Sequence, residues 1–326
     1  IKTLNTMMNV IISENLQDTE FIEKYAEGFE YLKEAVKDFT PERFERETGV
    51  KKELITEAAR LYAKAGSAAI CYTMGISQFS DGTSNVFSLS NLAILTGNLG
   101  KKGAGVNPLR GQNNVQGSCD MGALPNVIPA GAVNSAYAQE QARKVWHFEL
   151  NPVPGFKLTY APDKMDSGEL KVLYVYGENP VMSDPWTEHF VHATHHLDCF
   201  IVQDLFFTES AQKADVVLPA AGWGEKDGTF INTSRRVQRT RKASEPVGGV
   251  EPDWKVVCNI AKAMGLEGFD FLSAEEVWDE LRKLMPKFFG GISYYRLEKL
   301  GGISWPCPDE DHPGTPDLYT DHKSML

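Results

Sequence analysis

The stretch Lys171–Pro180 (KVLYVYGENP) places a run of apolar and aromatic residues directly before a polar loop. The same order recurs twice further along the chain, at Phe200–Asp204 (FIVQD) and at Asp215–Pro219 (DVVLP). Short, nearly continuous apolar strands bounded by helices are typical of a parallel sheet that is covered on both faces. The stretch therefore predicts an α/β fold in which parallel sheets are flanked by helices, in an αβα arrangement.

Apolar residues at helical spacing surround these strands on both sides along the chain. They predict helices over Met7–Glu14, Thr19–Phe39, Lys52–Lys64, Ser84–Thr96, Thr187–Leu197, Asp253–Met264 and Ser273–Leu284. Thr40 followed by Pro41 is typical of the start of a further helix, and Ala68–Tyr72 predicts a short buried strand. The residues from Pro306 to Thr320 are rich in Pro, Gly and Asp and predict an irregular segment.

Size and composition indicate an ordinary globular protein. The chain has 326 residues, of which 42% are hydrophobic and 24% charged, and this is long enough for two cores. No apolar run approaches the roughly 20 residues that span a bilayer, so no membrane span is expected. The formal net charge of -11 argues against a nucleic-acid partner, because phosphates require a basic surface. An anionic ligand would therefore be held by local donors.

Cysteine usage favours a reducing compartment. The five cysteines are scattered and form no C-x-x-C pair, so we expect a cytoplasmic protein without a visible zinc or iron-sulfur ligand set. The chain begins at Ile1-Lys2-Thr3-Leu4, without an initiator Met or a signal-peptide pattern. We therefore expect a piece of a longer polypeptide.

The run Arg110–Pro125 (RGQNNVQGSCDMGALP) combines an arginine, several amides and glycines without helix or strand periodicity. Asn and Gln side chains can read the edge of a heterocycle, and the guanidinium offers a fixed pair of donors to an anion. The alternative is a polar surface loop with ordinary Asx turns.

This run resembles the segment that follows the molybdenum-side strand region in formate dehydrogenase catalytic subunits, which are molybdopterin (bis-pyranopterin guanine dinucleotide) oxidoreductases. Further motifs resemble the family in the same order along nearly the whole chain. They are Cys71–Gln78, Leu95–Gly100, Tyr176–Pro180, Gln203-Asp204, Ala214–Pro219, the stretch from Trp223 to Gln238, and Pro252–Trp254.

The resemblance implies the central part of such a subunit, with a fold like domains 1–3 of formate dehydrogenase and dimethyl sulfoxide reductase, incomplete. Residues 1–112 would belong to a first α/β molybdopterin-binding domain and residues 113–222 to a second α/β dinucleotide-binding domain. Residues 223–326 would form a helical and irregular segment near the iron-sulfur domain.

Ligands of open α/β sheets bind beyond the carboxyl ends of the strands, and three polar loops are expected there. The resemblance assigns one pterin guanine dinucleotide to Gly177, Glu178, Asn179, Gln203, Asp204, Thr208, Asp215 and Asp253. Among these, Asp253 is expected to contact the guanine. Taken alone, each Asp is more often a helix cap or a turn residue.

The other dinucleotide and the metal are assigned by resemblance to Met74, Gln78 and Gln112. For Met74, the alternative is simple core filling. Arg110 is the expected catalytic contact, because a guanidinium can orient formate through paired hydrogen bonds and stays charged. Its alternative is a salt bridge to a neighbouring acid.

By resemblance, the parent enzyme would oxidise formate to CO2 at Mo or W and pass electrons to an iron-sulfur electron-transfer subunit or a hydrogenase. The family's [4Fe-4S] cysteine motif, its relay lysine, and its metal-ligating selenocysteine or cysteine with the adjacent histidine have no counterpart in this chain. The family's C-terminal barrel-like domain is also missing. We therefore expect the chain alone to be inactive.

Two other functions remain open. One is a catalytically silent scaffold of the same fold in a respiratory complex, and the other is a nitrate reductase-type relative. The motif RGQNNVQG at Arg110–Gly117 favours formate.

Two further patterns can suggest a site. His189, His192 and His196 have a helical spacing that could bind a divalent metal, with His195 beside them, but exposed helical histidines are commoner, so no metal ligand is predicted. A basic run is expected to contact cofactor phosphates or a subunit. It comprises Arg235, Arg236, Arg239, Arg241 and Lys242, and the residues to test first in this region are Gly228, Asn232 and Arg236.

Overall fold

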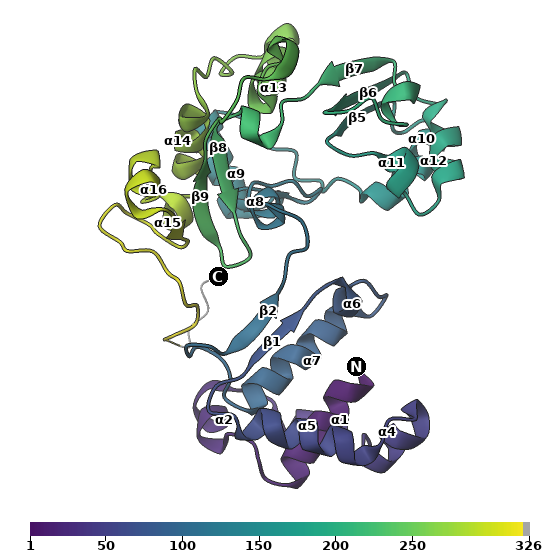
Figure 1. The fold of residues 1–326 in the computed structure, drawn as a ribbon, viewed down its shortest axis with the longest axis vertical. Helices are drawn as coiled ribbons and strands as arrows, with labels where there is room; N and C mark the ends of the chain where they lie inside the picture. Colours follow the sequence, from purple (N-terminus) through teal and green to yellow (C-terminus); the bar gives the residue numbers. More distant parts are fainter. Residues whose placement is uncertain (322–326) are drawn as a thin grey trace. The chain divides into compact units, whose positions relative to one another are not determined.

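The computed structural model describes residues 1–321 and divides into two compact units (Figure 1). Unit 1 comprises Ile1–Gln112 together with the residues from Pro316 onward, and unit 2 comprises Asn113–Thr315. No helix of the described residues is both long and apolar enough to cross a membrane.

Unit 1 is a group of helices packed beside a small parallel sheet. Its helices are α1 Lys2–Ser13, α2 Thr19–Tyr25, α3 Phe29–Val36, α4 Pro41–Thr48, α5 Lys52–Lys64, α6 Met74–Ser77 and α7 Gly82–Leu95. Its two strands, β1 Ala69–Tyr72 and β2 Gly105–Pro108, run parallel. The core lies between the apolar faces of α1, α5 and α7, where Met8, Ile11 and Leu92 are at most 2% exposed. Each such side chain contributes about 1.5–3 kcal/mol through burial.

Several predicted elements of unit 1 are confirmed and two differ. Thr40 caps α4, and its Oγ1 accepts from the backbone N–H of Arg43 at 3.3 Å. The helix predicted over Thr19–Phe39 is two helices, because Gly28 adopts a left-handed φ of 76° and starts a new one. Strand β2 was not predicted, since its sequence GVNP has little β-propensity.

Unit 2 contains the remaining helices and strands. Its helices are α8 Val115–Asp120, α9 Ala136–Trp146, α10 Ala161–Asp166, α11 Pro180–Ser183, α12 Thr187–Thr194, α13 Asp253–Ala263, α14 Ala274–Leu284, α15 Pro286–Phe289 and α16 Tyr294–Leu300. Short 3-10 turns cover Leu158–Tyr160, Ala211–Lys213, Trp223–Glu225 and Val247–Gly249. Its strands are β3 Val127–Ile128, β4 Gly131–Ala132, β5 Val172–Tyr176, β6 Cys199–Asp204, β7 Val216–Pro219, β8 Gly228–Ile231, β9 Arg236–Thr240 and β10 Ile303–Ser304.

The parallel sheet predicted from the apolar repeats is confirmed, but the predicted cover on both faces is not complete in the described residues, because Val172, Val216 and Val217 are 52%, 41% and 39% exposed. Strands β5, β6 and β7 are parallel and adjacent in that order, with Val172 opposite Cys199 and Ile201 opposite Val216. Helices α10, α11 and α12 lie beside this sheet in Figure 1. Met165 and Phe190, both fully buried, pack in the cluster that joins α10 and α12 to the sheet.

A second sheet in unit 2 was not predicted. Strands β8, β9 and β10 form an antiparallel sheet in the order β10-β9-β8, within the part expected to be helical or irregular. Strand β9 reads RVQRT, in which only Val237 is apolar and buried, so it carries a weak strand signal. The predicted helix over Ser273–Leu284 is confirmed, with Ser273 Oγ accepting from Glu276 N at 3.2 Å.

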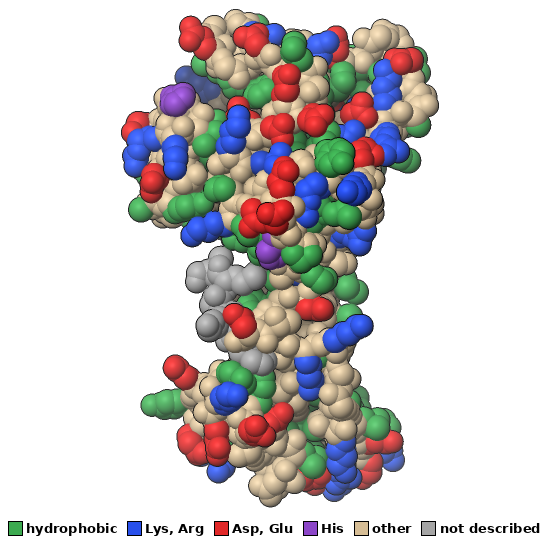
Figure 2. Space-filling model, turned by 90° about the vertical axis from the view of Figure 1, so that its left-hand side faces the viewer, with side chains coloured by type: hydrophobic (Ala, Val, Ile, Leu, Met, Phe, Trp, Pro, Cys, Tyr) green, Lys and Arg blue, Asp and Glu red, His purple; other side chains and the backbone are tan. Residues whose placement is uncertain are grey.

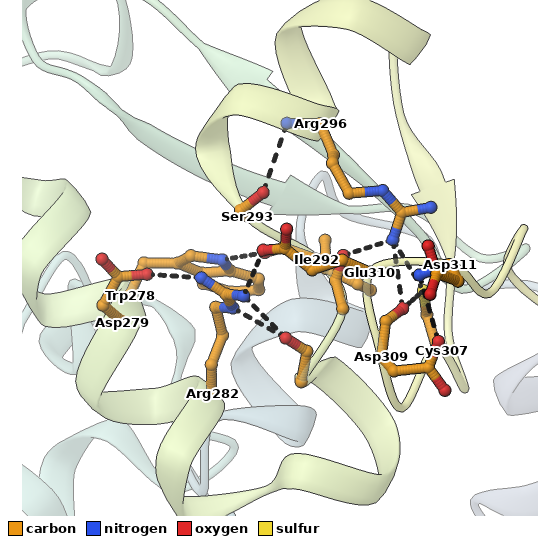
Figure 3. Close-up of polar contacts among 12 residues, drawn as sticks. Trp278, Asp279, Arg282, Ile292, Ser293, Arg296, Cys307, Asp309, Glu310 and Asp311 are labelled. Carbon is orange, nitrogen blue, oxygen red and sulfur yellow. Dashed lines mark hydrogen bonds and ion pairs between the residues drawn. The ribbon is translucent and has the colours of Figure 1, made fainter.

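Charged side chains hold the irregular segment after β10 to the helices (Figure 3). Arg296 Nη2 donates to the carbonyl of His312 at 2.7 Å, and Arg282 Nη2 donates to Glu310 Oε1 at 3.2 Å and to the carbonyl of Gly290 at 2.6 Å. Trp278 Nε1 donates to the carbonyl of Ile292 at 2.6 Å. The residues from Pro306 to Thr320 contain no helix or strand, as predicted, and these side chains supply partners for backbone groups of the flanking turns.

Candidate functional site

Four of the predicted site residues of unit 1 leave the same edge of its sheet. The parallel register pairs Tyr72 with Pro108, and Leu109 N donates to the carbonyl of Tyr72 at 2.8 Å, so both strands end together. Met74 and Gln78 belong to the turn after β1. Arg110 and Gln112 follow β2. All four side chains are exposed, and Met74, at 60% exposure, does not fill the core of unit 1.

The turn after β1 is fixed by its contacts with α7. A Cβ at Gly82 would lie 2.0 Å from the carbonyl oxygen of Ser77, so only glycine lets α7 begin this close to α6. The buried Asn85 donates from Nδ2 to the carbonyl of Ile76 at 3.0 Å. The backbone that carries Met74 and Gln78 is therefore positioned while their side chains remain accessible.

In unit 2, Asn179 joins the loop after β5 to the loop after β6. Its Oδ1 accepts from Ser210 N at 3.1 Å and from Ser210 Oγ at 2.7 Å. Its Nδ2 donates to Glu209 Oε2 at 2.7 Å, and this hydrogen bond lowers the pKa of Glu209. Thr208 Oγ1 accepts from Ala211 N at 3.3 Å. The side chains of Asn179 and Thr208 thus bond to neighbouring protein groups and position the loops at this sheet edge.

A buried polar chain lies beneath the same edge. Gln203 is fully buried, and its Nε2 donates to Asp253 Oδ1 at 2.9 Å. The hydroxyl of Tyr174 donates to Gln203 Oε1, and Lys226 pairs with the other carboxylate oxygen of Asp253. Asp253 is the first residue of α13, where the helix dipole favours a negative charge. Both carboxylate oxygens of the predicted guanine contact therefore already have protein partners.

The surface of this edge is formed by Gly177, Glu178 and Asp204. Gly177 and Glu178 are exposed and Asp204 is partly exposed. Gly177 has a left-handed φ of 64° and donates its N–H to the carbonyl of Gln203 at 2.9 Å. Asp204 Oδ1 accepts from Leu205 N at 2.6 Å, which orients the carboxylate.

Asp215 is not at this edge, which corrects the sequence-based placement. It precedes β7, so it lies near the amino end of a strand, whereas Gly177 and Glu178 follow β5 and Gln203 and Asp204 are the last residues of β6. Its Oδ2 accepts from Phe200 N at 2.7 Å and its own N–H donates to the carbonyl of Phe200 at 2.8 Å. The carboxylate therefore ties β7 to β6 as part of the fold.

The basic run on β9 is paired within unit 2. Arg239 lies 3.4 Å from Glu298 and 3.6 Å from the centre of the Tyr294 ring, and Arg241 pairs with the same carboxylate. Arg235 Nη2 donates to the carbonyl of Thr315 at 3.0 Å. Arg239 lies on β9 and Arg235 and Arg241 lie just outside it, and all three have partners within unit 2.

The first residues chosen for testing in this region form the hairpin. Gly228 starts β8, and Asn232 Oδ1 accepts from the N–H groups of Ser234 and Arg236 at 3.0 Å each. Arg236 Nη2 donates to the carbonyl of Gly301 at 3.2 Å. Asn232 therefore shapes the β8–β9 turn.

Sequence reasoning missed Lys226, Tyr174 and Ser210, which complete the unit 2 network. Lys226 falls inside the motif stretch from Trp223 to Gln238, but nothing in its neighbours marks a partly buried lysine with an ion-pair partner. Tyr174 gave a detectable signal, since a hydroxyl within an apolar strand requires a partner. Burial lowers the pKa of Lys226, and the charge of Glu225 opposes this shift.

The two edges fit the chemistry of a nucleotide-bearing cofactor. Glu178 and Asp204 offer acceptors for ribose hydroxyls or for guanine N–H groups. Arg110, Gln78 and Gln112 offer donors suited to a heterocycle edge or an anion. Figure 2 shows acidic side chains interspersed with basic ones, and the described residues form no broad basic surface on that face.

Comparisons with known proteins give a consistent set of relatives. A model of the family described as molybdopterin oxidoreductase matches residues 1–263. The chain is 50% identical over 325 residues to the F420-dependent formate dehydrogenase subunit alpha of Methanocaldococcus jannaschii, which covers 98% of this chain and 47% of that protein. It is 44% identical over 311 residues to formate dehydrogenase H of Escherichia coli, which covers 95% of this chain and 43% of that protein.

Among solved structures, acetylene hydratase from Pelobacter acetylenicus matches with a TM-score of 0.71 at 19% sequence identity. The match covers 99% of this chain and 47% of that structure, and it bears on the fold alone. The chain spans about half the length of the curated relatives it matches.

Proposed function

Because the chain belongs to the molybdopterin oxidoreductase family, we propose that it is the central part of a formate dehydrogenase catalytic subunit. In this proposal it supplies part of the cradle for a bis-pyranopterin guanine dinucleotide that carries Mo or W. Residues 1–112 form part of the first molybdopterin-binding domain, and residues 113–222 form part of a second. Residues 223–326 lie near the iron-sulfur domain of the parent enzyme.

One observation carries the proposal most directly. Arg110 and Gln112 leave the carboxyl edge of the β1–β2 sheet beside the turn that bears Met74 and Gln78, and all four are exposed. This is the edge at which open α/β sheets bind ligands. Identities of 50% and 44% to two formate dehydrogenases support formate as the substrate.

Arg110 binds and orients the substrate in this proposal. When bound, the metal-pterin group supplies the two-electron redox chemistry that converts formate to CO2. The guanidinium of Arg110 donates two parallel hydrogen bonds to the formate carboxylate and remains charged at any working pH. Each charge-assisted hydrogen bond is worth about 1.5–3 kcal/mol, so orientation by Arg110 contributes substantially to kcat/KM.

The unit 2 edge holds one guanine dinucleotide. Glu178 and Asp204 accept hydrogen bonds from the nucleoside, and Gly177 allows close approach of the backbone. Asn179, Thr208 and Gln203 act as positioning residues, because their side chains bond to neighbouring protein groups. Asp253 has 7% exposure and both of its oxygens have protein partners, so its proposed guanine contact requires one oxygen to accept a second hydrogen bond.

The parent enzyme would transfer the electrons through a [4Fe-4S] cluster to a partner subunit in the cytoplasm. The cluster motif and the metal-ligating selenocysteine or cysteine of the family have no match in this sequence. We therefore expect the purified 326-residue chain to give no steady reduction of viologen by formate. Sustained turnover by this chain alone would contradict the proposal that the cluster motif and the metal ligand lie in a part of the parent enzyme outside this chain.

The test uses the longest polypeptide that contains this chain, expressed with its partner subunits under anaerobic conditions. We expect Mo or W, guanine nucleotide released by acid, and formate-dependent viologen reduction. Absence of both the metal and the guanine nucleotide would indicate the catalytically silent scaffold subunit. Nitrate reduction in place of formate oxidation would indicate a nitrate reductase-type relative.

A further inference from the structure

Helices α10 and α12 bring a carboxylate and three imidazoles together in unit 2. Asp166, the last residue of α10, has its Oδ2 2.7 Å from His189 Nε2 and its Oδ1 3.0 Å from His196 Nδ1. The rings of His192 and His196 meet edge to face with centroids 5.5 Å apart. The ligand atoms of Asp166, His192 and His196 all lie within 4.8 Å of one another.

This cluster is separate from the proposed cofactor edge. Helix α10 ends shortly before β5 begins, and α12 ends shortly before β6 begins, so the cluster lies near the amino ends of these strands. The loops assigned to the cofactor follow the carboxyl ends. A ligand bound at the cluster would therefore be a second ligand of unit 2.

The three ligand atoms are of the kinds that bind a divalent transition-metal ion such as Zn²⁺. Two imidazole nitrogens and one carboxylate oxygen are typical of Zn²⁺, with ligand distances of about 2.0–2.2 Å and water completing a tetrahedron. Atoms now up to 4.8 Å apart must move inward by about 1 Å in total for this geometry. Asp166, His192 and His196 are all exposed, so their side chains can rotate that far and an ion can enter from solvent.

The backbone beneath the cluster is rigid, which reduces the entropy lost on binding. Met165, next to Asp166, is fully buried, and so are Phe190 and Ala193 on α12. His189 is only 17% exposed at its side chain, and its bond to Asp166 Oδ2 leaves Oδ1 on the side of His196.

We propose that Asp166, His192 and His196 bind one divalent transition-metal ion of the Zn²⁺ type, with His189 as a positioning residue that holds the carboxylate. The ion links the end of α10 to the end of α12. His195, which is exposed and adjacent in sequence, takes no part.

The test measures Zn²⁺ affinity of the full chain, prepared without a polyhistidine tag, by competition with a chromogenic chelator. The unmodified chain should bind one high-affinity Zn²⁺ ion. His192→Ala, His196→Ala and Asp166→Asn should each lower the affinity at least tenfold. His195→Ala is the matched control and should change the affinity less than twofold. Co²⁺ should give visible absorption bands typical of tetrahedral coordination in the unmodified chain and in the His195→Ala variant. The His192→Ala, His196→Ala and Asp166→Asn variants should lack these bands.

His189 is tested by two variants. His189→Gln retains a donor toward Asp166 and should keep the affinity within threefold, and His189→Leu removes the donor and should lower the affinity at least fivefold. Circular dichroism and thermal unfolding without metal should match the unmodified chain for each variant. The proposal is overturned if the unmodified chain and the His192→Ala variant bind Zn²⁺ with the same affinity. It is also overturned if His195→Ala lowers the affinity as much as His192→Ala does.

Discussion

The two sheet edges that carry the candidate site are built differently. The β5–β6 edge of unit 2 rests on a buried polar network through Gln203 and Asp253 and on the Asn179 bridge between its loops. The β1–β2 edge of unit 1 fixes its backbone through Gly82 and Asn85 and leaves its candidate side chains exposed.

This difference separates stability from ligand binding. At the unit 2 edge, the polar residues stabilise the fold as well as the proposed nucleotide site, so a substitution there affects both. At the unit 1 edge, we expect that exposed side chains can be changed with little effect on folding, and the proposed function predicts that the change affects substrate and cofactor binding. The predictions below test this contrast, from the largest expected effect to the smallest.

The largest effect is expected for Arg110→Ala in the cofactor-loaded parent enzyme. Loss of two charge-assisted hydrogen bonds to formate should lower kcat/KM about a thousandfold, equivalent to about 4 kcal/mol. Steady-state kinetics with formate and viologen measure this. Arg60→Ala is the matched control, since Arg60 forms an exposed ion pair with Glu14 in the same unit. A similar loss in both variants would show that the effect is structural.

The next largest effect is on stability at the unit 2 edge. Asp253→Ala should lower the free energy of unfolding by about 3 kcal/mol, because Lys226 and Gln203 lose their partner in a largely buried place. Gln112→Ala at the unit 1 edge should stay within about 0.5 kcal/mol of the unmodified chain. Urea unfolding of both variants measures the difference. Equal losses would remove the contrast between the edges.

Asn179→Ala should cost about 2 kcal/mol. The substitution leaves the hydroxyl of Ser210 without the acceptor it uses, and Ser210 is fully buried. Gln212→Ala, an exposed change close by, is the comparison and should be nearly neutral. If urea unfolding shows no loss for the Asn179 variant, the two loops do not depend on this bridge.

The smallest effect concerns alkaline pH and the antiparallel sheet of unit 2. Burial raises the pKa of Tyr294 to about 12, and Arg239 opposes the shift. The unfolded tyrosine titrates near 10, so the unfolded state releases its proton first and stability falls between about pH 10 and 12. Tyr294→Phe should remove about 1 kcal/mol of this loss at pH 11. Identical pH profiles of unfolding for both chains would refute this.

The apolar repeats predicted the parallel sheet because each strand of β5, β6 and β7 is short, apolar and followed by a turn. The β8–β9 hairpin was missed because β9 reads RVQRT, in which Val237 is the single buried apolar residue and the other four residues are polar or charged. Strand β2 was missed because Gly105 and Pro108 are rare in strands. A sequence pattern predicts a strand from the burial of that strand's own apolar side chains. Strands β2 and β9 have few such side chains, and they pair with the neighbouring strands β1 and β8 through the backbone.

For the site residues, the accuracy of the predicted placement depended on which end of a strand each residue lies at. Residues after a strand, such as Glu178 and Asp204, were correctly placed at the carboxyl edge, since all parallel strands end on the same side. Asp215 was misplaced because it precedes its strand, and the motif alone did not distinguish the two ends. Lys226 could not be found from sequence, because its partner Asp253 is distant along the chain.

The central claim is that the carboxyl edge of each unit's parallel sheet contributes to the binding of one of the two pterin guanine dinucleotides. The most direct measurement is the metal and guanine nucleotide content per polypeptide of the parent enzyme, purified under identical conditions with substitutions at each edge. We predict that the double variant Gln78→Ala/Gln112→Ala, with folding intact, and the single variant Asp204→Ala each retain less than about a tenth of the cofactor, and that Gln212→Ala retains all of it. Full cofactor content in both edge variants would contradict the claim.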